Sequence, residues 1–390
     1  MDTKNTKSTS YFNPNTAPGT ILIAMSGGVD SSVAACLMQE AGWSCKGVTM
    51  RLFSNEAIGM DGKTCCSLRD VADAEAVARR LGIPFRAVDF QPDFRREVIE
   101  KFIRVYEEGG TPNPCIDCNR TMKFSKLLEL AMAEGCDHMA TGHYARVEYD
   151  AARGRWLLRK AADAKKDQSY VLYMLTQEQL AHLILPLGRL TKPEIREIAA
   201  AHGFVNAHKQ ESQDICFVPD GDYVRFMEDY TGSEYPDGDF LDMEGNVVGR
   251  HRGAVRYTTG QRKGLGLAMG SPVYVQSKDM RTNTVTVGPE EFLFRRELIA
   301  CDANWISVPD LTEPMRVLAM PRYRKKESPA TLYPLTLDAP DPSAVQGSCN
   351  RVRVVFDDPQ RAMTPGQAIV FYDIDEPDLV VGGATIETIE

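Results

Sequence analysis

The sequence ILIAMSGGVDSS at residues 21–32 decides the fold of this chain. Its first part, Ile21 to Met25, is a short apolar run, which is typical of a strand buried on both faces of a parallel sheet. Its second part, Ser26 to Ser32, is a glycine-rich turn, and a helix reading VAACLM follows from Val33. Glycines let backbone N–H groups point into one concavity, and a helix start adds a partial positive charge. The stretch therefore predicts a strand, a turn and a helix that together bind an anion.

This anion site differs from a Walker-type phosphate loop, because the pattern G-x-x-x-x-G-K-[ST] is absent. Ser31 and Ser32 add hydroxyl donors to the turn. The alternative interpretation is an ordinary tight turn whose serines cap the helix. An isolated Gly-Gly would favour that alternative, whereas the full S-G-G-x-D-S-S string behind an apolar run favours the anion site.

Strands and helices alternate along the first part of the chain. We expect strands at 45–53, at 83–90, just before Gly142 and at 155–160, and helices at 67–81, from Pro92 and at 122–134. This alternation predicts a doubly wound, parallel α/β sheet. Ligands of such sheets bind outside the carboxyl ends of the strands. The turn after Met25, Met50 and Gly142 all lie at or just after strand ends, so we expect them to line one nucleotide pocket.

The composition changes in the second half of the chain. A helix with a capping box at Thr191–Glu194 is expected to end before Gly203. The run Glu211–Val218 passes from polar residues into a short strand-like stretch. From Asp220 the glycines cluster, and after Glu290–Arg296 short Val/Ile/Tyr-rich strands with Pro and Gly turns indicate a small β-barrel or sandwich.

The overall composition is that of a globular protein. The chain has 390 residues, of which 43% are hydrophobic and 25% charged, enough for two or three domains. No apolar run reaches the length of a membrane span, and the Asn/Thr/Ser/Pro-rich start lacks the apolar core of a signal peptide. We therefore expect a cytoplasmic protein, in which ten cysteines point to thiol chemistry or metal binding and not to a disulfide framework.

The formal net charge of -9 argues against nucleic acid as a partner, because affinity for nucleic acid comes mostly from neutralised phosphates. Local basic clusters count for more than the net charge. One cluster holds Arg250, Arg252, Arg256, Arg262 and Lys263, and the other holds Arg316, Arg322, Arg324, Lys325 and Lys326. Taken alone, each cluster is compatible with a solvated face.

The segment TPNPCIDCNR at residues 111–120 carries the most informative cysteines. We expect a loop here, with Cys118 just before a helix, where the helix start and Arg120 lower the pKa of a thiol. A C-x-x-C pair such as Cys115 and Cys118 can be a redox pair, half of a zinc site or part of an iron–sulfur site. A four-cysteine zinc site would need a second such pair, which the sequence lacks. Cys216 is the remaining candidate sulfur, although single cysteines are often small core residues.

The SGGVDSS string resembles the pyrophosphatase loop of the N-type ATP pyrophosphatases, also called the PP-loop superfamily. Enzymes of that superfamily activate a carbonyl oxygen by adenylation and release pyrophosphate. The resemblance implies that the loop holds the pyrophosphate end of ATP and that Asp30 organises the loop and its Mg²⁺. The residues that it assigns to ATP binding are Ala24, Met25, Ser26, Gly27, Gly28, Val29, Asp30, Ser31, Ser32, Met50 and Gly142.

Five further strings follow in order: TPNPCIDCNR, TGHYARV, KKDQSYVLYML, ESQDICFV and YTTGQRKGLG. With the loop, they resemble the tRNA-specific 2-thiouridylase family from about Gly19 to Glu390. The resemblance implies ATP-dependent 2-thiolation of the wobble uridine of tRNA. In that reaction ATP adenylates the C2 oxygen, Cys216 carries a persulfide and Cys118 is the catalytic nucleophile. A cysteine desulfurase or a sulfur-relay protein is implied as the sulfur donor.

The same resemblance assigns residues to RNA binding. Contacts with the target base fall to Asn113, Pro114 and Cys115. Contacts with the rest of the tRNA fall to His143, Lys166, Asp167, Gln168, Arg322, Tyr323 and Gln367. Without the resemblance, each of these polar side chains would be interpreted as an ordinary solvated residue.

Composition and resemblance together divide the chain into four parts. These are a disordered tail at 1–18, a PP-loop ATP pyrophosphatase domain at 19–219, a central tRNA-binding domain at 220–290 and a C-terminal β-barrel at 291–390. The basic clusters of the two smaller domains then become expected contacts with the tRNA backbone.

One departure from the family leaves the route of the sulfur open. Many members carry aspartate where this chain has Cys115, so Cys115, Cys118 and Cys216 could instead hold a [4Fe-4S] cluster with one open iron that carries an external sulfide. We prefer the persulfide. Another ATP-dependent ligase on the same scaffold would not need the two cysteines, and a non-catalytic tRNA-binding protein would not need an intact SGGVDSS, so both are weaker alternatives.

Overall fold

The computed structural model describes residues 17–54, 68–209, 215–335 and 350–390. The tail expected at 1–18 lies almost entirely outside the described residues, as does the start of the run at Glu211. Contacts divide the chain into two compact units. Unit 1 comprises Met1–Val98, Cys115–Gly221 and Asp378–Val380, and unit 2 comprises Ile99–Pro114, Asp222–Pro377 and Val381–Glu390.

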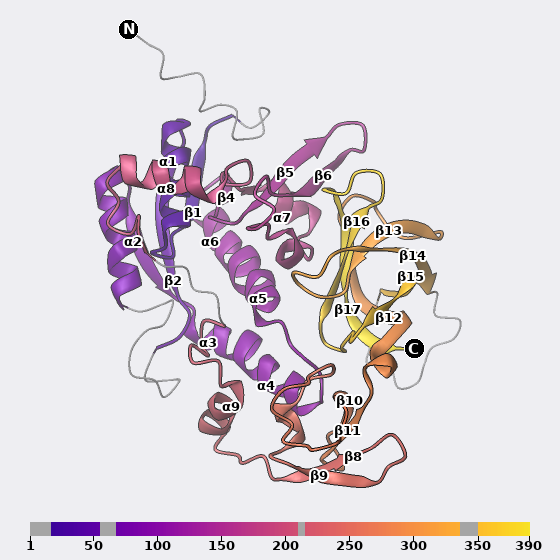
Figure 1. Ribbon diagram of the computed structural model, residues 1–390. Helices are drawn as coiled ribbons and strands as arrows, with labels where there is room; N and C mark the ends of the chain where they lie inside the picture. The colour runs from indigo at the N-terminus through magenta and orange to yellow at the C-terminus, as the bar shows by residue number, and fades with distance from the viewer. Residues whose placement is uncertain (1–16, 55–67, 210–214, 336–349) are drawn as a thin grey trace. The chain divides into compact units, whose positions relative to one another are not determined.

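Unit 1 is built on a five-stranded parallel sheet in the order β3-β2-β1-β4-β7; β2, β1 and β4 are labelled in Figure 1. Its strands are β1 (Thr20–Ala24), β2 (Ser44–Arg51), β3 (Phe85–Asp89), β4 (His138–Ala140) and β7 (Leu183–Ile184). The predicted parallel α/β fold is therefore confirmed. Ile21 and Ile23 in the central strand β1 are 0% exposed, as expected of an apolar run that is covered on both faces.

Helices connect and follow these strands. Helix α1 (Val29–Glu40) leads from β1 to β2, α2 (Leu68–Leu81) leads from β2 to β3, and α8 (Lys192–Ala201) follows β7. All three pack with the sheet in one core cluster, through apolar side chains such as Val33, Val77 and Ile195. The predicted capping box of α8 is confirmed, since Glu194 accepts a hydrogen bond from the Thr191 N–H at 2.7 Å.

A long, mostly helical path links β3 to β4. Its segments are α3 (Gln91–Phe94), the π-helix η3 (Arg95–Ile99), α4 (Glu100–Glu107), α5 (Pro114–Asp117), the π-helix η4 (Cys118–Lys126) and α6 (Leu127–Ala133). The loop predicted around the two cysteines is wrong from Pro114 onward. Helical structure begins at Pro114, because the fixed φ of proline suits the first turn of a helix. Cys118 consequently lies within a helical run and not before it.

Unit 1 also contains the antiparallel hairpin of β5 (Ala145–Asp150) and β6 (Arg155–Lys160), the 3₁₀-helix η5 (Ser169–Leu172) and α7 (Gln177–Ala181). The strand-like run predicted before Val218 is wrong in its described part. That part forms a turn in which the Val218 N–H donates to the Ile215 carbonyl at 2.8 Å. Pro219 follows, and it has no N–H to offer a strand partner.

Unit 2 contains α4 of the helical path, α9 (Tyr223–Thr231), a four-stranded sheet and a closed barrel. The sheet has the order β10-β11-β8-β9. Its strands are β8 (Gly238–Leu241), β9 (Val247–His251), β10 (Tyr274–Asp279) and β11 (Thr284–Gly288), and the 3₁₀-helix η6 (Ala254–Arg256) follows β9. The barrel has the order β12-β15-β14-β13-β16-β17. Its strands are β12 (Phe294–Trp305), β13 (Met315–Met320), β14 (Ser328–Leu335), β15 (Arg351–Arg361), β16 (Ala368–Asp373) and β17 (Val380–Ile389), and the 3₁₀-helix η7 (Glu290–Leu293) precedes β12. The predicted C-terminal β-barrel is confirmed.

Closure of the barrel leaves no open sheet edge, which removes a site of unwanted strand pairing. Alternate residues of its strands fill the interior, as Val352, Val354 and Phe356 do in β15. In the parts of the chain that the structure describes, no helix is long and apolar enough to cross a membrane.

Candidate active site

The predicted nucleotide loop follows the carboxyl end of β1, where the order of the sheet reverses. From β1 the chain runs outward to β2 and β3 on one side and later returns to β4 and β7 on the other. Such a reversal is the usual ligand site of a doubly wound sheet. Ala24 ends β1, Met25 follows it, Met50 lies one residue before the end of β2, and Gly142 follows β4. The structure therefore gathers these predicted ATP-binding residues at one edge of the sheet.

Helix α1 starts earlier than predicted, with Gly28 as its N-cap residue. Asp30, Ser31 and Ser32 therefore lie in its first turn, where backbone N–H groups have no partner within the helix. Both serine hydroxyls donate to the Gly28 carbonyl at 3.0 Å, and Ser31 Oγ accepts from the Ser26 N–H at 3.1 Å. The serines that were expected to donate to a phosphate thus hold the loop in shape.

Two glycines of the site have no room for a side chain. Gly27 has a φ of +76°, and a Cβ there would lie 2.2 Å from the carbonyl oxygen of Asp70. A Cβ on Gly142 would lie 2.8 Å from the backbone nitrogen of Ser31. The turn after β4 therefore lies directly against the first turn of α1, and both turns can approach a ligand with bare backbone.

Asp30 is held by two side chains that the sequence did not single out. Its Oδ1 accepts hydrogen bonds from Tyr144 Oη and from Lys192 Nζ, both at 2.6 Å. Lys192 is the first residue of α8 and is only 8% exposed. Its ammonium group therefore joins the first turns of α1 and α8 through a largely desolvated ion pair.

A second lysine holds another part of the loop. Lys209 Nζ donates to the Gly27 carbonyl at 3.2 Å, to Asp70 at 2.5 Å and to Asp73 at 2.7 Å. Burial opposes the charge of Lys209, but the two carboxylates outweigh burial and raise its pKa. Asn206 Nδ2 donates to the same carbonyl at 2.9 Å. No local pattern signals Lys209 or Asn206, because the chain after α8 reaches the loop only through the fold.

These contacts bear on the expected ligands. Backbone N–H groups, a helix start and the absence of bulky side chains at two glycines fit the phosphates of ATP. Mg²⁺ prefers carboxylate oxygens, but Asp30, Asp70 and Asp73 each accept from a lysine ammonium group. Because these carboxylates are already paired with lysines, the loop fits the phosphates of a nucleotide better than a metal ion bound by the protein alone. Mg²⁺ stays a prediction.

Cys118 begins the π-helix η4 and is buried. Burial raises the pKa of its thiol to about 11, with Lys123 opposing the rise and Cys115 adding to it. The lowered pKa expected from a helix start and Arg120 is therefore wrong, because the loss of solvent outweighs the nearby positive charge. The sulfur is a protonated thiol in this state.

Asn119 follows Cys118 and is 2% exposed. Its Nδ2 donates to the Val171 carbonyl at 2.9 Å, while its Oδ1 is buried and lacks a partner among the described residues. Buried polar atoms are nearly always satisfied. The Asn119 amide oxygen beside Cys118 is therefore a buried acceptor without a donor among the described residues.

The other two candidate cysteines are more accessible. Cys115 is exposed one helical turn before Cys118, and Cys216 is half-buried in the turn before Phe217. Phe217 packs edge-on against Phe94 with ring centroids 5.8 Å apart, which ties this turn to the core. The three sulfurs do not all lie within 4.8 Å of one another. A cubane cluster holds its cysteine sulfurs further apart than that, so the iron–sulfur alternative stays a prediction.

His143 was predicted to contact tRNA, but its side chain lies inside unit 1. It is 8% exposed, and its ring nitrogens contact Thr141 Oγ1 at 2.7 Å and Lys123 Nζ at 3.4 Å. Burial and Lys123 hold the pKa of His143 well below its usual range. The imidazole is therefore neutral, and a contact with RNA would require it to become exposed.

Asp167 and Gln168 hold the local backbone. Asp167 Oδ1 accepts from the Ala161 N–H at 2.8 Å, and Gln168 Oε1 accepts from the Tyr144 N–H at 2.9 Å. Gln168 therefore positions Tyr144, whose hydroxyl donates to Asp30 of the nucleotide loop. Lys166 is half-buried, and the role of these three residues in tRNA binding stays a prediction.

Gln367 lies in the turn before β16 of unit 2. Its Nε2 donates to the carbonyls of Thr111 at 2.9 Å and Pro112 at 3.4 Å, and the Thr111 N–H donates to the Pro365 carbonyl at 3.0 Å. The turn thus clamps the backbone that leads to Asn113–Pro114, the predicted contact with the target base. Gln367 therefore positions that segment, and its contact with tRNA stays a prediction.

Ion pairs neutralise part of both basic clusters. Arg256 pairs with Glu228 at 2.7 Å, and Arg316 pairs with Asp357 at 2.6 Å. The exposed members are Arg250, Arg252, Arg262, Lys263, Arg316, Arg322, Arg324 and Lys326. Arg322, Tyr323 and Arg324 share the turn between β13 and β14, where the guanidinium group of Arg324 lies 5.5 Å from the Tyr323 ring centroid.

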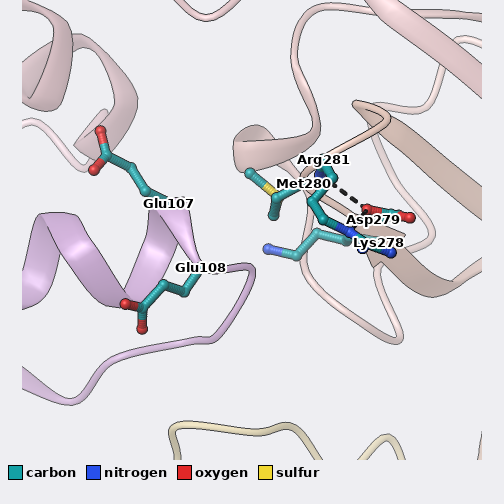
Figure 2. A pocket seen from close by; sticks show the side chains of 6 residues that line it. All are labelled: Glu107, Glu108, Lys278, Asp279, Met280 and Arg281. Carbon is teal, nitrogen blue, oxygen red and sulfur yellow. Dashed lines mark hydrogen bonds and ion pairs between the residues drawn. The ribbon is translucent and has the colours of Figure 1, made fainter.

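Unit 2 has a cavity of about 660 Å³ lined by Glu107, Glu108 and Lys278–Arg281. Figure 2 shows the Lys278 ammonium group projecting toward the side on which the two glutamates lie. Its Nζ is shielded from water and has no hydrogen-bond partner in the described part of the chain. Burial lowers the pKa of Lys278 from 10.5 to about 8. A desolvated ammonium group without a partner destabilises the folded state.

Replacing Lys278 by methionine should therefore raise the free energy of unfolding at neutral pH by about 1–3 kcal/mol. Because the folded pKa of about 8 lies below the ordinary 10.5, the unfolded chain binds more protons between these values. The stability of the wild type should rise with pH through that range, and the rise should be smaller in Lys278→Met. Urea unfolding at several pH values measures both effects. An equal gain in Lys326→Met, which removes an exposed lysine, would contradict the role of burial.

Three family models match the chain in succession. Residues 19–220 match the tRNA methyl transferase HUP domain, residues 224–289 match the tRNA methyl transferase PRC-barrel domain, and residues 295–386 match the aminomethyltransferase beta-barrel domain. The matches follow the sheet of unit 1, the four-stranded sheet and the closed barrel in chain order.

Curated relatives match nearly the whole chain. The tRNA-specific 2-thiouridylase MnmA of Symbiobacterium thermophilum is 50% identical over 372 residues, which are 94% of this chain and 92% of the relative. The protein of the same name from Moorella thermoacetica is 51% identical over 369 residues, which are 94% of this chain and 99% of the relative. Among solved structures, a 4-thiouridine synthetase–RNA complex with bound ATP is similar at 19% identity and a TM-score of 0.33, over 55% of this chain and 50% of that one; this likeness is too low to bear on function.

Proposed function

The chain belongs to the tRNA-specific 2-thiouridylase family, and from this membership we propose that it thiolates C2 of the wobble uridine of tRNA by adenylating the C2 oxygen and transferring sulfur from a persulfide on Cys216. Identity of 50–51% over 94% of the chain is the observation that carries the proposal. As a member of the family, the chain is an ATP-using tRNA sulfurtransferase that forms 2-thiouridine. The names of whole-chain relatives are more specific than the methyltransferase names of the domain models.

The first proposed step takes place at the loop between β1 and α1. The N–H groups of the first turn of α1 bind the pyrophosphate end of ATP. The uridine O2 attacks the α-phosphorus, the bond to pyrophosphate breaks, and AMP remains on O2. The ion pair of Asp30 with Lys192 and the contacts of Lys209 support this step, because they hold the loop before ATP arrives. Mg²⁺, if bound with ATP, would screen the charge of the phosphates.

The second proposed step moves the sulfur. The terminal sulfur of the Cys216 persulfide loses its proton and attacks C2, and AMP leaves with the former C2 oxygen. The Cys118 sulfur then attacks Sγ of Cys216, the S–S bond of the adduct breaks, and the outer sulfur stays on C2. The base regains at N3 the proton that it lost on adenylation, and the protons of the persulfide and of the Cys118 thiol pass to solvent. The products are 2-thiouridine, AMP and a Cys118–Cys216 disulfide, which a thiol reductant must reduce before the next turnover.

The environments of the two cysteines support these different roles. Cys216 is half-buried, so a cysteine desulfurase or sulfur-relay protein can load it with sulfur. Cys118 is buried, and its raised pKa keeps it protonated. A protonated thiol is a poor nucleophile, so Cys118 stays unreactive until the bound base and the Cys216 sulfur change its surroundings.

We propose that the central part at 220–290 and the barrel part at 291–390 bind the tRNA backbone, while 19–219 carries the chemistry. The family matches at 19–220, 224–289 and 295–386 support this division. Although the net charge of the chain is -9, the exposed arginines of both basic clusters supply local positive charge for phosphates.

Reversing the charges of Arg322 and Arg324 should weaken tRNA binding by tenfold or more, because two exposed guanidinium groups would repel phosphates that they now attract. Each lost phosphate contact should also flatten the slope of log affinity against log salt by about 0.7–0.9. Filter binding or fluorescence anisotropy over a salt series measures both.

The matched control reverses Arg79 and Arg153, which pair with Glu75 and Asp150 on unit 1. This double variant changes the net charge equally and should keep the wild-type slope. An unchanged slope in the Arg322→Glu/Arg324→Glu variant would place the tRNA backbone elsewhere.

The proposed function is tested by incubating unmodified tRNA with the protein, ATP, a cysteine desulfurase and cysteine. Mass spectrometry of the digested tRNA should find 2-thiouridine at the wobble position, and the nucleotide products should be AMP and pyrophosphate. Omission of ATP should abolish the product. Release of ADP and phosphate, or sulfur on another nucleoside, would overturn the proposal.

A further inference from the structure

Three side chains of unit 1 that the proposed reaction does not use lie together. Cys36 and Glu40 lie one turn apart on the same face of α1, and His202 directly follows α8. His202 Nε2 is 3.4 Å from Cys36 Sγ and 3.2 Å from Glu40 Oε1. Within 17–54, 68–209, 215–335 and 350–390, this is the one group of three His, Cys, Asp or Glu residues whose ligand atoms all lie within 4.8 Å of one another.

The position of His202 is set before any ligand binds. Its N–H continues α8 by donating to the Ile198 carbonyl at 3.0 Å, and Gly203 then turns the chain with a φ of +62°. Arg80 Nε donates to the His202 carbonyl, and the imidazole stacks on Phe204 with centroids 5.7 Å apart. The ring nitrogen Nε2 is thus presented to α1 by the helix end and its neighbours.

The spacing suits tetrahedral coordination. Zinc binds thiolate sulfur at about 2.3 Å, imidazole nitrogen at about 2.0–2.1 Å and carboxylate oxygen at about 2.0–2.2 Å. At tetrahedral angles these bond lengths separate sulfur from nitrogen by about 3.6 Å and nitrogen from oxygen by about 3.4 Å. The observed 3.4 Å and 3.2 Å are each close to these values, so a cation requires only small movements of the side chains.

We propose that Cys36, Glu40 and His202 bind a divalent transition-metal cation, with Zn²⁺ as the best fit and water as the fourth ligand. Sulfur and nitrogen donors favour zinc over Mg²⁺ or Ca²⁺, which take oxygen ligands. Three protein ligands and one open position are a common zinc arrangement. The side chains of His202 and Glu40 are 36% and 45% exposed, so the cation and the water can enter from solvent.

A divalent cation here would be bound by the Cys36 sulfur as a thiolate and by the Glu40 carboxylate, and it would neutralise both negative charges.

The site lies at the far end of α1 from the nucleotide loop. Asp30 and Lys192 already join the first turns of α1 and α8, and a cation at Cys36, Glu40 and His202 joins their last turns. The two helices are then linked at both ends. A ligand that binds only the folded state stabilises it by mass action, so Zn²⁺ should raise the stability of unit 1 whether or not the proposed reaction is correct.

The test adds Zn²⁺ or Co²⁺ to the full-length protein after treatment with a chelator. Thiols in general bind these metals, so the comparison of variants decides which sites belong to this group. Cys36→Ser, Glu40→Gln and His202→Gln should each lower the affinity of one class of metal sites by roughly tenfold or more. Zn²⁺ should raise the thermal midpoint of the wild type more than that of these variants. The thiolate-to-cobalt charge-transfer absorption of this site should disappear in Cys36→Ser.

Matched controls are Cys45→Ser, which alters another buried thiol, and Glu197→Gln and His208→Gln, which alter exposed residues near the site in sequence. All three variants should bind Zn²⁺ and Co²⁺ with the stoichiometry and affinity of the wild type. Glu40 is exposed, so Glu40→Gln tests the site even where Cys36→Ser fails to fold. Equal stoichiometry, affinity and thermal shift in the wild type and Glu40→Gln would overturn the proposal and leave the group as a hydrogen-bonded cluster.

Discussion

Replacing Cys118 or Cys216 by serine is expected to lower 2-thiouridine formation by roughly 10³-fold or more, while the first release of pyrophosphate persists. Serine keeps the approximate size of cysteine, but its hydroxyl neither carries a persulfide sulfur nor attacks a disulfide. The two sulfurs act only after the uridine has been adenylated. A single-turnover experiment that quantifies pyrophosphate and, by mass spectrometry, 2-thiouridine separates the two steps.

Cys136→Ser is the matched control, because Cys136 is also a buried thiol of unit 1 whose pKa is raised by burial. It should keep both activities. If Cys118→Ser lost pyrophosphate release together with thiolation, its assigned role in sulfur transfer would be wrong.

The same assay separates the two sulfur routes. If the persulfide route holds, iron-free protein is active, and Cys115→Asp retains substantial activity because aspartate stands there in many relatives. If activity appears only in iron-loaded protein and Cys115→Ala, Cys118→Ala and Cys216→Ala each lose the bound iron, the cluster route is favoured. The substrate and the product would be unchanged.

Breaking the ion pair between Asp30 and Lys192 is expected to lower adenylation by roughly 10²-fold or more, because the pair holds the first turn of α1 where ATP is proposed to bind. Asp30→Ala also leaves Lys192, a lysine that is only 8% exposed, without its carboxylate partner. Loss of one partner from a buried pair costs about 3–5 kcal/mol. The Asp30 side chain is 27% exposed, so we expect Asp30→Ala to lower the free energy of unfolding by about 3 kcal/mol or less.

A double variant separates stability from function. Asp30→Ala/Lys192→Met removes both charges and should recover much of the lost stability, but not the release of pyrophosphate. Urea unfolding and pyrophosphate release are measured on the same preparations. Asp93→Ala/Lys126→Met removes another partly buried ion pair of unit 1 and should leave adenylation intact. Normal pyrophosphate release by Asp30→Ala would show that the loop does not need the pair.

Features that depend on neighbouring residues were predictable from the sequence. The buried strand Ile21–Ile23 followed from an apolar run, and the start of α8 followed from the Thr191 capping box, because each pattern encodes its own local structure. Short Val/Ile/Tyr-rich strands indicated a small barrel or sandwich, and the structure shows a closed barrel. The start of the helix at Pro114 was missed, because the cysteines suggested a loop and the helix-starting preference of proline was given less weight.

The state of Cys118 was not predictable, because its pKa depends on solvent and not on sequence position. A helix start and a nearby arginine lower a thiol pKa only when water remains to solvate the thiolate. The packing of η4 removes that water, and desolvation then dominates. The same reason applies to His143, which sequence interpretation assigned to the surface and the fold buries.

By itself, the sequence determined the strand, turn and helix of the nucleotide loop, the parallel sheet and barrel, and the resemblance that names the family. Only the tertiary structure decided which distant side chains serve the loop, namely Tyr144, Lys192, Asn206 and Lys209, and which form the group of Cys36, Glu40 and His202. The physical reason is that α1 and α8 meet by burying apolar faces. That burial brings their polar residues together at both ends, and no local pattern in either helix records which residue of the other it will meet.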